Sequence, residues 1–312
     1  KYLVTGGAGF IGSHIAERLV KEGERVRVLD NLETGKMENL APFGDRVEFI
    51  KGDIRSWDVV KKAVSGIEYI FHEAALRSVP KSMTEPVLYH EVNVTGTLNL
   101  LEIARQGKAK KFVFASSSSL YGNSETFPQR EDLASQAISP YALGKRTGEE
   151  YCAFYSSVFG LPTVCLRYFN VFGPRQTMDN EYAVVIPKFI TSILKRESPP
   201  IYGDGQQSRD FTFVTNVVDA NLAAARSDVG RGEIINVACG ETRTILVLAQ
   251  EIARLTDAKD VQPKFLPPRV GDIRRSHADI TRLKKILGVT PRVSFEEGLK
   301  ALIQWFQTQK AA

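Results

Sequence analysis

A glycine-rich turn directly after the first apolar run constrains the fold of this chain more than any other feature. Residues 2–12 read Tyr-Leu-Val-Thr-Gly-Gly-Ala-Gly-Phe-Ile-Gly, and a helical pattern of apolar residues follows. Gly6, Gly9 and Gly12 permit a sharp turn, a close approach of the backbone to a pyrophosphate, and tight packing of a helix on its strand. The free N–H groups at the start of that helix favour phosphate oxygens. The segment therefore predicts a strand, a turn and a helix that together bind a dinucleotide.

An acidic residue ends the second apolar run. Residues 25–29 predict a strand, and Asp30 follows it 24 positions after Gly6. In a dinucleotide-binding unit, a carboxylate at this place accepts hydrogen bonds from the adenosine ribose. It also repels a 2'-phosphate, which favours NAD over NADP. An isolated Asp after a strand is more often a solvated turn or a helix cap, and only the glycine turn upstream makes the binding role the better interpretation.

Tyr141 and Lys145 suggest a chemical step. If residues 141–145 are helical, the two side chains share a face, and they follow Ser117 in the serine-rich run 116–119. A nearby cation favours the phenolate form of a tyrosine, so we expect Lys145 to lower the pKa of Tyr141 and to make it a base. Alone, the pattern also fits a half-exposed Tyr beside a solvated Lys.

Apolar strands and helical patterns alternate through the first half of the chain, which predicts a parallel sheet covered on both faces. We expect an α/β fold: a Rossmann-type, doubly wound parallel sheet with a smaller mixed α/β substrate domain. The predicted NAD-binding domain covers residues 1–170, and residues near 211–240 are expected to return to it. The remaining residues of 171–312, which are richer in Gly and Pro, form the predicted substrate domain.

Composition limits the classes of function. The chain has 312 residues and a net charge of +5, spread without a basic block, so an anionic substrate is a better expectation than nucleic acid. Its three cysteines form no Cys-x-x-Cys pair and its four histidines show no metal-ligand spacing. No run approaches the ~20 apolar residues of a membrane span. We expect a cytoplasmic protein without a membrane segment and without a bound metal.

Five ordered motifs resemble the extended short-chain dehydrogenase/reductase superfamily, and within it the UDP-glucose / UDP-N-acetylglucosamine 4-epimerases. The likeness runs from residue 2 to about residue 305. Its motifs are Gly-Gly-Ala-Gly-Phe-Ile-Gly, Ser-Ser-Ser-x-x-Tyr-Gly, Tyr-x-x-x-Lys, Arg-Tyr-Phe-Asn-Val-Phe-Gly-Pro and Gly-Asp-Gly-x-x-x-Arg-Asp. The resemblance implies that one bound NAD oxidises the sugar at C4 and then reduces the 4-keto sugar from its other face, with a UDP-hexose as substrate.

The resemblance also implies a role for individual residues. Ser117, Tyr141 and Lys145 would be catalytic, with Tyr141 as base. The implied cofactor-binding residues are Gly6, Gly9, Phe10, Ile11, Gly12, Asp30, Asn31, Asp53, Ile54, Ala74, Ala75, Arg77, Asn93, Tyr141, Lys145 and Tyr168. Arg77 stands where many sugar epimerases carry Lys. The implied substrate-binding residues are Ser117, Tyr141, Asn170, Arg209, Arg269, Asp272 and Ser276.

The identity of the sugar depends on Ser276. In the family, a bulky Tyr at the matching position excludes N-acetylated sugars, so the small Ser276 predicts that UDP-N-acetylhexosamines are accepted beside UDP-glucose and UDP-galactose. The competing view is that backbone placement sets the pocket volume. By resemblance alone, we also expect a homodimer that pairs through helices near 89–106 and 145–159.

Three other functions compete with this interpretation of the sequence. A UDP-glucuronate 4-epimerase or decarboxylase stays open because Arg175 is a conceivable clamp for a sugar carboxylate. A nucleotide-sugar 4,6-dehydratase is disfavoured, since the run around Ser117 lacks the acid pair that water elimination requires. From another class, the chain could be a non-catalytic NAD-sensing regulator, although such proteins commonly lose the Tyr or the Lys.

Overall fold

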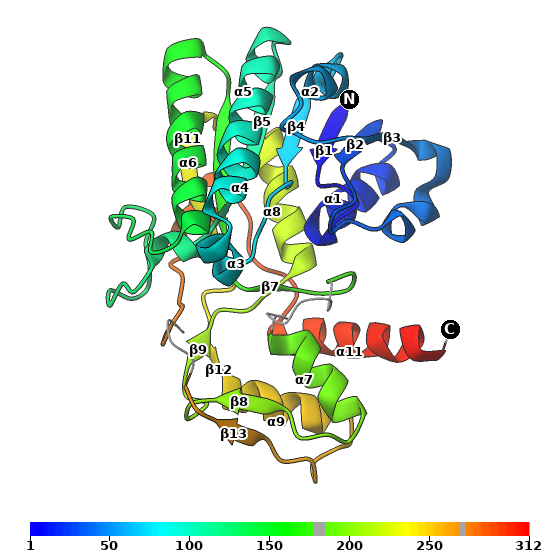
Figure 1. The fold of residues 1–312 in the computed structure, drawn as a ribbon, viewed down its shortest axis with the longest axis vertical. Coiled ribbons are helices and arrows are strands. Elements are labelled where there is room, and N and C mark those ends of the chain that lie inside the picture. Colours follow the sequence, from blue (N-terminus) through cyan, green and yellow to red (C-terminus); the bar gives the residue numbers. More distant parts are fainter. Residues whose placement is uncertain (177–184, 269–272, 312) are drawn as a thin grey trace.

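A parallel sheet forms the centre of the molecule. The computed structural model describes residues 1–176, 185–268 and 273–311, and among these residues seven strands form the main sheet, in the order β11-β6-β5-β4-β1-β2-β3 (Figure 1). All neighbouring strands in it are parallel. The strands are β1 (Tyr2–Thr5), β2 (Val26–Asp30), β3 (Val47–Lys51), β4 (Tyr69–His72), β5 (Lys111–Ser117), β6 (Thr163–Tyr168) and β11 (Arg231–Val237). The predicted Rossmann-type sheet is confirmed.

Helices cover both faces of this sheet because its inner strands, β1, β2, β4, β5 and β6, are buried on both sides. One face carries α1 (Phe10–Lys21), α8 (Val214–Arg226) and α10 (Thr281–Leu287). Ile15 and Val217 are buried in the core on this side. The other face carries α2 (Trp57–Val64), α5 (Gly96–Gln106) and α6 (Pro140–Phe159). Leu101 and Cys152 are buried there, and Figure 1 shows α5 and α6 side by side.

Local signals fix both ends of α6, the helix that carries Tyr141. The Ser139 side chain caps the first turn by accepting a hydrogen bond from the Ala142 N–H at 3.2 Å, and Pro140 occupies the first helical position. Gly160 ends the helix in the left-handed conformation, with φ of 69°. These caps set the register that turns Tyr141 and Lys145 towards the carboxyl ends of the strands.

The expected helix over 89–106 is helical throughout, but its type changes within this range. The structure has α4 (Pro86–His90), then a π-helical turn at Glu91–Thr95, and then α5. A short helix, α3 (Val79–Thr84), precedes them. π turns are rare and occur frequently at functional sites. Here the turn contains Asn93, whose contacts are described below.

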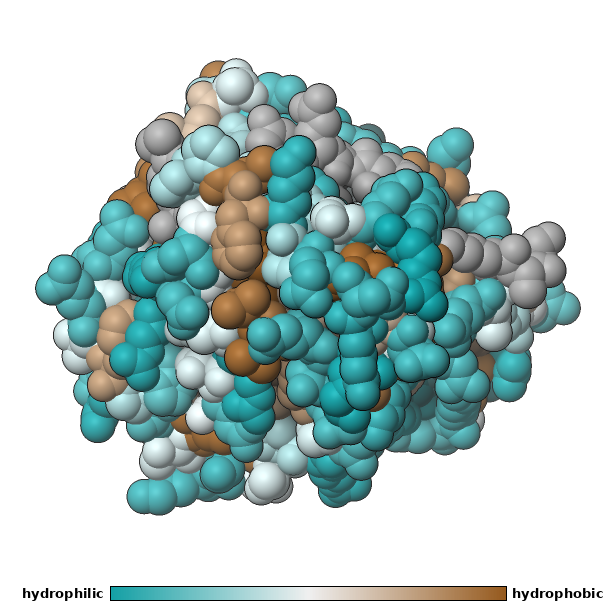
Figure 2. Space-filling view, turned by 90° about the horizontal axis from the view of Figure 1, so that it is seen from below, coloured by the Kyte–Doolittle hydropathy of each residue, from teal (hydrophilic) through white to brown (hydrophobic). Residues whose placement is uncertain are grey.

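The C-terminal part packs around a separate apolar core that includes Phe189, Leu248 and Leu302. Its helices are α7 (Val185–Leu194), α9 (Ile245–Leu255) and α11 (Phe295–Ala311). Short strands pair as β7 (Val171–Phe172) with β10 (Thr212–Phe213), β8 (Pro200–Tyr202) with β13 (Lys264–Leu266), and β9 (Ser208–Arg209) with β12 (Arg243–Thr244). Figure 2 views the molecule from this end, where hydrophilic side chains cover most of the face and hydrophobic ones form only narrow strips.

Neither a membrane span nor a metal cluster is found among the residues that the structure describes. None of their helices is both long and apolar enough to cross a bilayer. The same residues contain no group of three or more His, Cys, Asp or Glu side chains placed to hold a metal ion.

Candidate functional site

A cleft of about 460 Å³ runs along the carboxyl ends of the sheet, where β1 has β4 on one side and β2 on the other. Open α/β sheets bind their ligands at such a reversal of strand order. The predicted cofactor residues that line the cleft are Gly6, Gly9, Phe10, Ile11, Gly12, Asp30, Asn31, Asp53, Ile54, Ala74, Ala75, Arg77, Tyr141, Lys145 and Tyr168. Of the predicted substrate residues, Ser117, Tyr141 and Asn170 line it. Asn93, Arg209 and Ser276 lie outside its lining.

The glycine turn has the geometry that a phosphate-binding loop needs. Gly6 has a φ of +67°, and a Cβ there would lie 2.7 Å from the Ala74 nitrogen. A Cβ on Gly12 would lie 2.3 Å from the Gly6 carbonyl oxygen, so that only glycine lets α1 approach the turn. Gly9 precedes α1 without a side-chain cap. The first N–H groups of α1 are therefore left to a ligand in the cleft, which fits a dinucleotide pyrophosphate.

Asp30 supports the turn as well as facing the cleft. Its carboxylate accepts hydrogen bonds from the Ala8 N–H at 3.0 Å and the Leu32 N–H at 2.8 Å. Burial raises the pKa of Asp30, while these two N–H groups oppose the rise. Each carboxylate oxygen uses one lone pair in this way and keeps another that a ribose hydroxyl can use. Beside it, the Asn31 amide donates to Asp53 at 3.3 Å.

Asn93 lies outside the lining of the cleft but holds a loop that forms part of this lining. Its amide nitrogen donates to the Leu76 carbonyl and its oxygen accepts from the Leu76 N–H, both at 2.9 Å. Both backbone groups of Leu76 are thereby satisfied by one buried side chain. The π-helical turn that carries Asn93 thus fixes the loop 74–77, whose residues line the cleft.

Ser117, Tyr141 and Lys145 meet at the end of β5. Burial raises the pKa of Tyr141, while a hydrogen bond with Ser117 and the charge of Arg77 lower it. Lys145 is buried, its ammonium donates to the Ala115 carbonyl at 2.6 Å, and burial lowers its pKa to about 8. The Lys145 ammonium is directed at a backbone carbonyl, and the cation that lowers the pKa of Tyr141 in this structure is Arg77. A lowering of this pKa by Lys145 stays a prediction.

Asn170 links the cleft to Ser276, another of the predicted substrate residues. Its amide donates to the Asp210 carbonyl at 3.1 Å and to the Ser276 hydroxyl at 3.2 Å. Ser276 is therefore one hydrogen bond away from a residue that lines the cleft. Arg209 lies on β9, where it donates to the Ser208 carbonyl at 2.9 Å. Arg269 and Asp272 lie outside the described residues.

Arg175 is held away from the cleft. Its guanidinium pairs with Glu17 of α1 at 2.6 Å and does not belong to the lining of the cleft. The idea that Arg175 clamps a sugar carboxylate is not supported by this position.

Two polar groups that sequence reasoning missed support the site. Glu149 of α6 accepts hydrogen bonds from Ser116 at 2.5 Å and forms a buried ion pair with Arg167 at 2.7 Å, which ties the ends of β5 and β6 to α6. Glu73 lines the cleft together with Ser117, Tyr141 and Lys145. No motif signals either residue, because their partners lie far away in the sequence.

A parallel sheet with a glycine turn, and a Ser-Tyr-Lys set at the end of β5, define an enzyme of the short-chain dehydrogenase/reductase type. The chain belongs to the NAD dependent epimerase/dehydratase family, whose model matches residues 2–238. NAD is the cofactor of this family, and the lining of the cleft fits it.

Several relatives of this chain carry the names of UDP-sugar enzymes. The chain is 40% identical over 311 residues to a UDP-glucose 4-epimerase of Mycolicibacterium smegmatis, covering 98% of each chain. It is 39% identical over 315 residues to a UDP-N-acetyl-alpha-D-glucosaminuronate decarboxylase of Bacillus cytotoxicus, covering 98% of this chain and 97% of the other. The UDP-N-acetylglucosamine 4-epimerase of Methanobrevibacter ruminantium M1, solved with UDP-N-acetylmuramic acid, superposes with a TM-score of 0.95 at 42% identity, covering 99% and 98%. The family and cofactor predicted from the sequence are confirmed.

Proposed function

We propose that this protein is a UDP-hexose 4-epimerase that acts on UDP-glucose and UDP-galactose and on their N-acetylhexosamine counterparts. The observation that carries the proposal is the meeting of Ser117 and Tyr141 with the glycine turn in one cleft. The relatives with UDP-sugar epimerase activity in their names support the substrate class.

In this proposal Tyr141 removes the proton from the sugar 4-hydroxyl, and Ser117 donates a hydrogen bond to the same oxygen. The glycine turn and the residues that line the cleft would hold NAD, and the bound cofactor would supply the hydride acceptor and donor for C4. The product differs from the substrate only in the configuration at C4, so the proton that Tyr141 takes is given back in the second half of the reaction. Arg77, whose charge favours the phenolate, supports Tyr141 as a base.

We propose that Asn170 and Ser276 together determine whether the enzyme accepts N-acetylated as well as unsubstituted sugars. Ser276 is buried and small, and it contacts Asn170 by a hydrogen bond of 3.2 Å. A larger side chain here would displace Asn170 into the cleft, where it would compete with a substituent on C2 of the sugar.

The decarboxylase relative motivates a second candidate, in which oxidation at C4 is followed by loss of carbon dioxide from a UDP-glucuronate-type sugar. This reaction requires a group that binds the sugar carboxylate. The ion pair between Arg175 and Glu17 leaves that arginine unsuited to the task, which is why we place the epimerase first.

Incubation with a panel of UDP-hexoses, followed by separation of products, tests the proposal. We expect UDP-glucose and UDP-galactose to interconvert, UDP-N-acetylglucosamine and UDP-N-acetylgalactosamine to interconvert, and UDP-glucuronate to yield no carbon dioxide. Tyr141→Phe should lower turnover by roughly 10²- to 10⁴-fold, the usual contribution of a general base. Carbon dioxide release without epimerisation would favour the decarboxylase, and NAD binding without any turnover would favour a sensor.

Ser276→Tyr tests the sugar range. We expect turnover of the N-acetylated pair to fall by more than roughly tenfold, while turnover of the unsubstituted pair changes little, because only the former fills the space near C2. Ser276→Ala is the matched control, since it removes the hydroxyl without adding bulk. An equal loss on both sugar pairs would contradict the role of Ser276.

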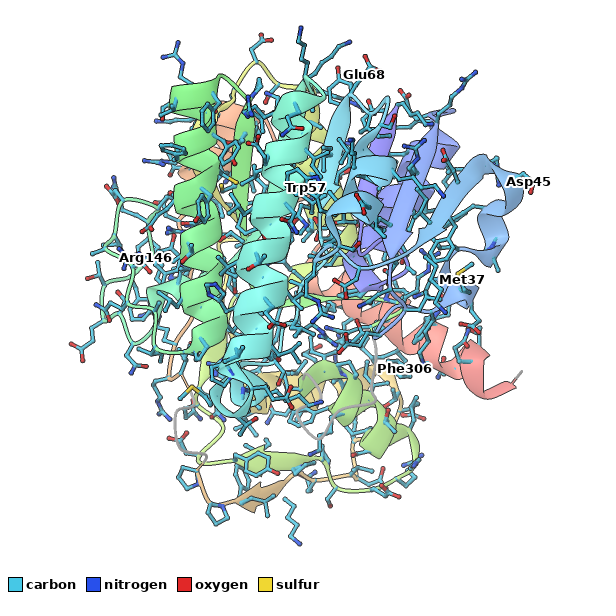
Figure 3. All side chains as sticks on the ribbon, turned by 45° about the horizontal axis from the view of Figure 1, so that its top comes forward. Met37, Asp45, Trp57, Glu68, Arg146 and Phe306 are labelled. Carbon is cyan, nitrogen blue, oxygen red and sulfur yellow. The ribbon has the colours of Figure 1, made fainter. Side chains whose placement is uncertain are left out.

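We also propose a homodimer. The outer surface of α6 exposes Phe154, Val158 and Phe159, and α4 adds Val87. Figure 3 shows Arg146, which is on the same helix, with its side chain directed away from the sheet. An exposed apolar strip on a helix that already covers a sheet is suited to pairing with a second copy.

A further inference from the structure

Glu73 follows β4 directly and lines the cleft together with Tyr141, Lys145 and Tyr168. The other carboxylates in the lining are Asp30, which ends β2, Glu33, which follows β2, and Asp53, which follows β3. Glu73 therefore belongs to the catalytic end of the cleft, whereas the other carboxylates lie at the end predicted to bind adenosine.

The surroundings of Glu73 shift the pKa of its carboxyl group in opposing directions. Burial raises the pKa of Glu73 to about 7, while a hydrogen bond from Tyr168 and the charge of Lys145 act in the opposite direction. The titratable groups that face it are Lys145 and Tyr141 of α6 and Tyr168 of β6. Burial raises the pKa of both phenols, so Glu73 is the acid among these three groups that loses its proton first.

The hydrogen bonds around Glu73 accommodate either state. The Tyr168 hydroxyl lies 2.7 Å from Glu73 Oε1, and Asn221 of α8 presents its Nδ2 at 2.8 Å and its Oδ1 at 3.1 Å to the same hydroxyl. When Glu73 is ionised, Asn221 can donate to Tyr168, which donates to the carboxylate. When Glu73 is protonated, the direction of both hydrogen bonds can reverse. A change of charge at Glu73 therefore needs no rearrangement of the core.

We propose that the Glu73 carboxylate offsets the positive charge of the oxidised nicotinamide ring. It thereby favours binding of the oxidised over the reduced cofactor. The inference rests on the NAD-dependent chemistry of the proposed function and goes beyond it. Lys145 places a buried cation at the same end of the cleft, which by itself disfavours the positively charged ring. Glu73 counters this effect, so the resting enzyme keeps its cofactor in the form that starts a turnover.

Titration calorimetry with the full-length chain, freed of bound nucleotide, tests the inference. NAD⁺ and NADH are each titrated at pH 7 in two buffers that differ in ionisation enthalpy, which yields the number of protons released. We expect NAD⁺ to release more protons than NADH, because only the charged ring drives Glu73 to ionise. In Glu73→Gln the difference should vanish, and the affinity ratio should shift on the order of tenfold towards NADH, the scale of losing one nearby charge.

Glu33→Gln is the matched control. It removes one charge from the cleft at the other end, so it should change the affinities for NAD⁺ and NADH by the same factor. Equal proton release by both nucleotides in the wild-type protein would overturn the inference without any variant. An unchanged affinity ratio in Glu73→Gln, with a normal thermal unfolding transition, would do the same.

The failure of this inference and that of the proposed function are distinguishable, since no sugar enters the calorimetric experiment. A protein that releases protons with NAD⁺ as expected but epimerises no UDP-hexose would disprove the proposed function alone. A protein that epimerises UDP-hexoses but binds both nucleotides with equal proton release would disprove the role of Glu73 alone.

Discussion

Burial and charge act in opposite directions on the phenol of Tyr141. Burial raises its pKa, whereas Ser117 and Arg77 lower it, and Lys145 instead hydrogen-bonds to the Ala115 carbonyl. The i, i+4 spacing correctly places Tyr141 and Lys145 on one face of α6. It could not show where the ammonium points, because that depends on a carbonyl of β5, 30 positions earlier in the chain.

Arg77→Gln should move the activity of the enzyme to higher pH. A cation stabilises the phenolate, so its removal raises the pKa of Tyr141, and the rising limb of the profile of kcat against pH shifts to the alkaline side. Turnover near neutral pH should fall and should recover as the pH is raised. Arg77→Lys, which keeps the charge, should leave the limb close to its original place. A uniform loss at every pH would instead indicate that Arg77 acts by binding a ligand.

Several cleft residues were predictable because each lies at or just after the carboxyl end of a strand. Gly6, Asp53 and Ala74 follow β1, β3 and β4, while Asp30 ends β2 and Ser117 ends β5. Parallel strands bring these points to one edge of the sheet. The contacts of Glu73 and Arg175 were not predictable, since their partners Tyr168 and Glu17 are 95 and 158 positions away.

At the scale of elements, the π-helical turn between α4 and α5 is the departure from the predicted fold that matters most to the site. The apolar pattern of 89–106 predicted one continuous helix, and the chain is indeed helical throughout this range. The spacing of apolar residues does not indicate that the hydrogen bonding changes from α-helical to π-helical at Glu91–Thr95. The resemblance to the family nevertheless implied that Asn93 belongs to the cofactor site, although it did not show which groups Asn93 contacts.

Asn93→Ala should weaken NAD binding and destabilise the fold. Both backbone groups of Leu76 would lose their partner, at a cost of about 1–3 kcal/mol in the free energy of unfolding. The loop 74–77 would also have to be ordered by the cofactor, so we expect the affinity for NAD to fall roughly tenfold, equivalent to about 1.4 kcal/mol. Chemical denaturation and titration with NAD measure the two effects.

Asn216→Ala is the control for Asn93→Ala. Asn216 is equally buried and makes the same kind of clamp, donating to the Val293 carbonyl at 2.8 Å and accepting from the Val293 N–H at 3.1 Å. It does not line the NAD cleft. It should therefore reproduce the loss of stability but not the loss of affinity. If both variants bind NAD equally weakly, the effect belongs to overall stability and not to the loop.

At the scale of the whole molecule, the outer surface of α6 leads to a prediction about assembly. Phe154→Arg should convert the proposed homodimer into a monomer, because a charge in an apolar interface costs several kcal/mol, equivalent to a loss of affinity of roughly 100-fold or more. Sedimentation velocity measures the change. Phe265→Arg, on β13 and similarly exposed, is the control and should leave the dimer intact. A monomeric wild-type protein would contradict the dimer itself.

The order of strands has a consequence for how the chain is made. The strand β6 is an inner strand only because β11 pairs with it, and residues 169–230 lie between the two strands in sequence. As the chain emerges from the ribosome, β6 therefore presents an open apolar edge until residue 237 has been synthesised. An open edge of this kind is a site of aggregation. We expect a shortened protein that ends near residue 170 to precipitate under conditions in which the longer chain does not. On this view the proposed cofactor-binding residues 1–170 do not fold on their own.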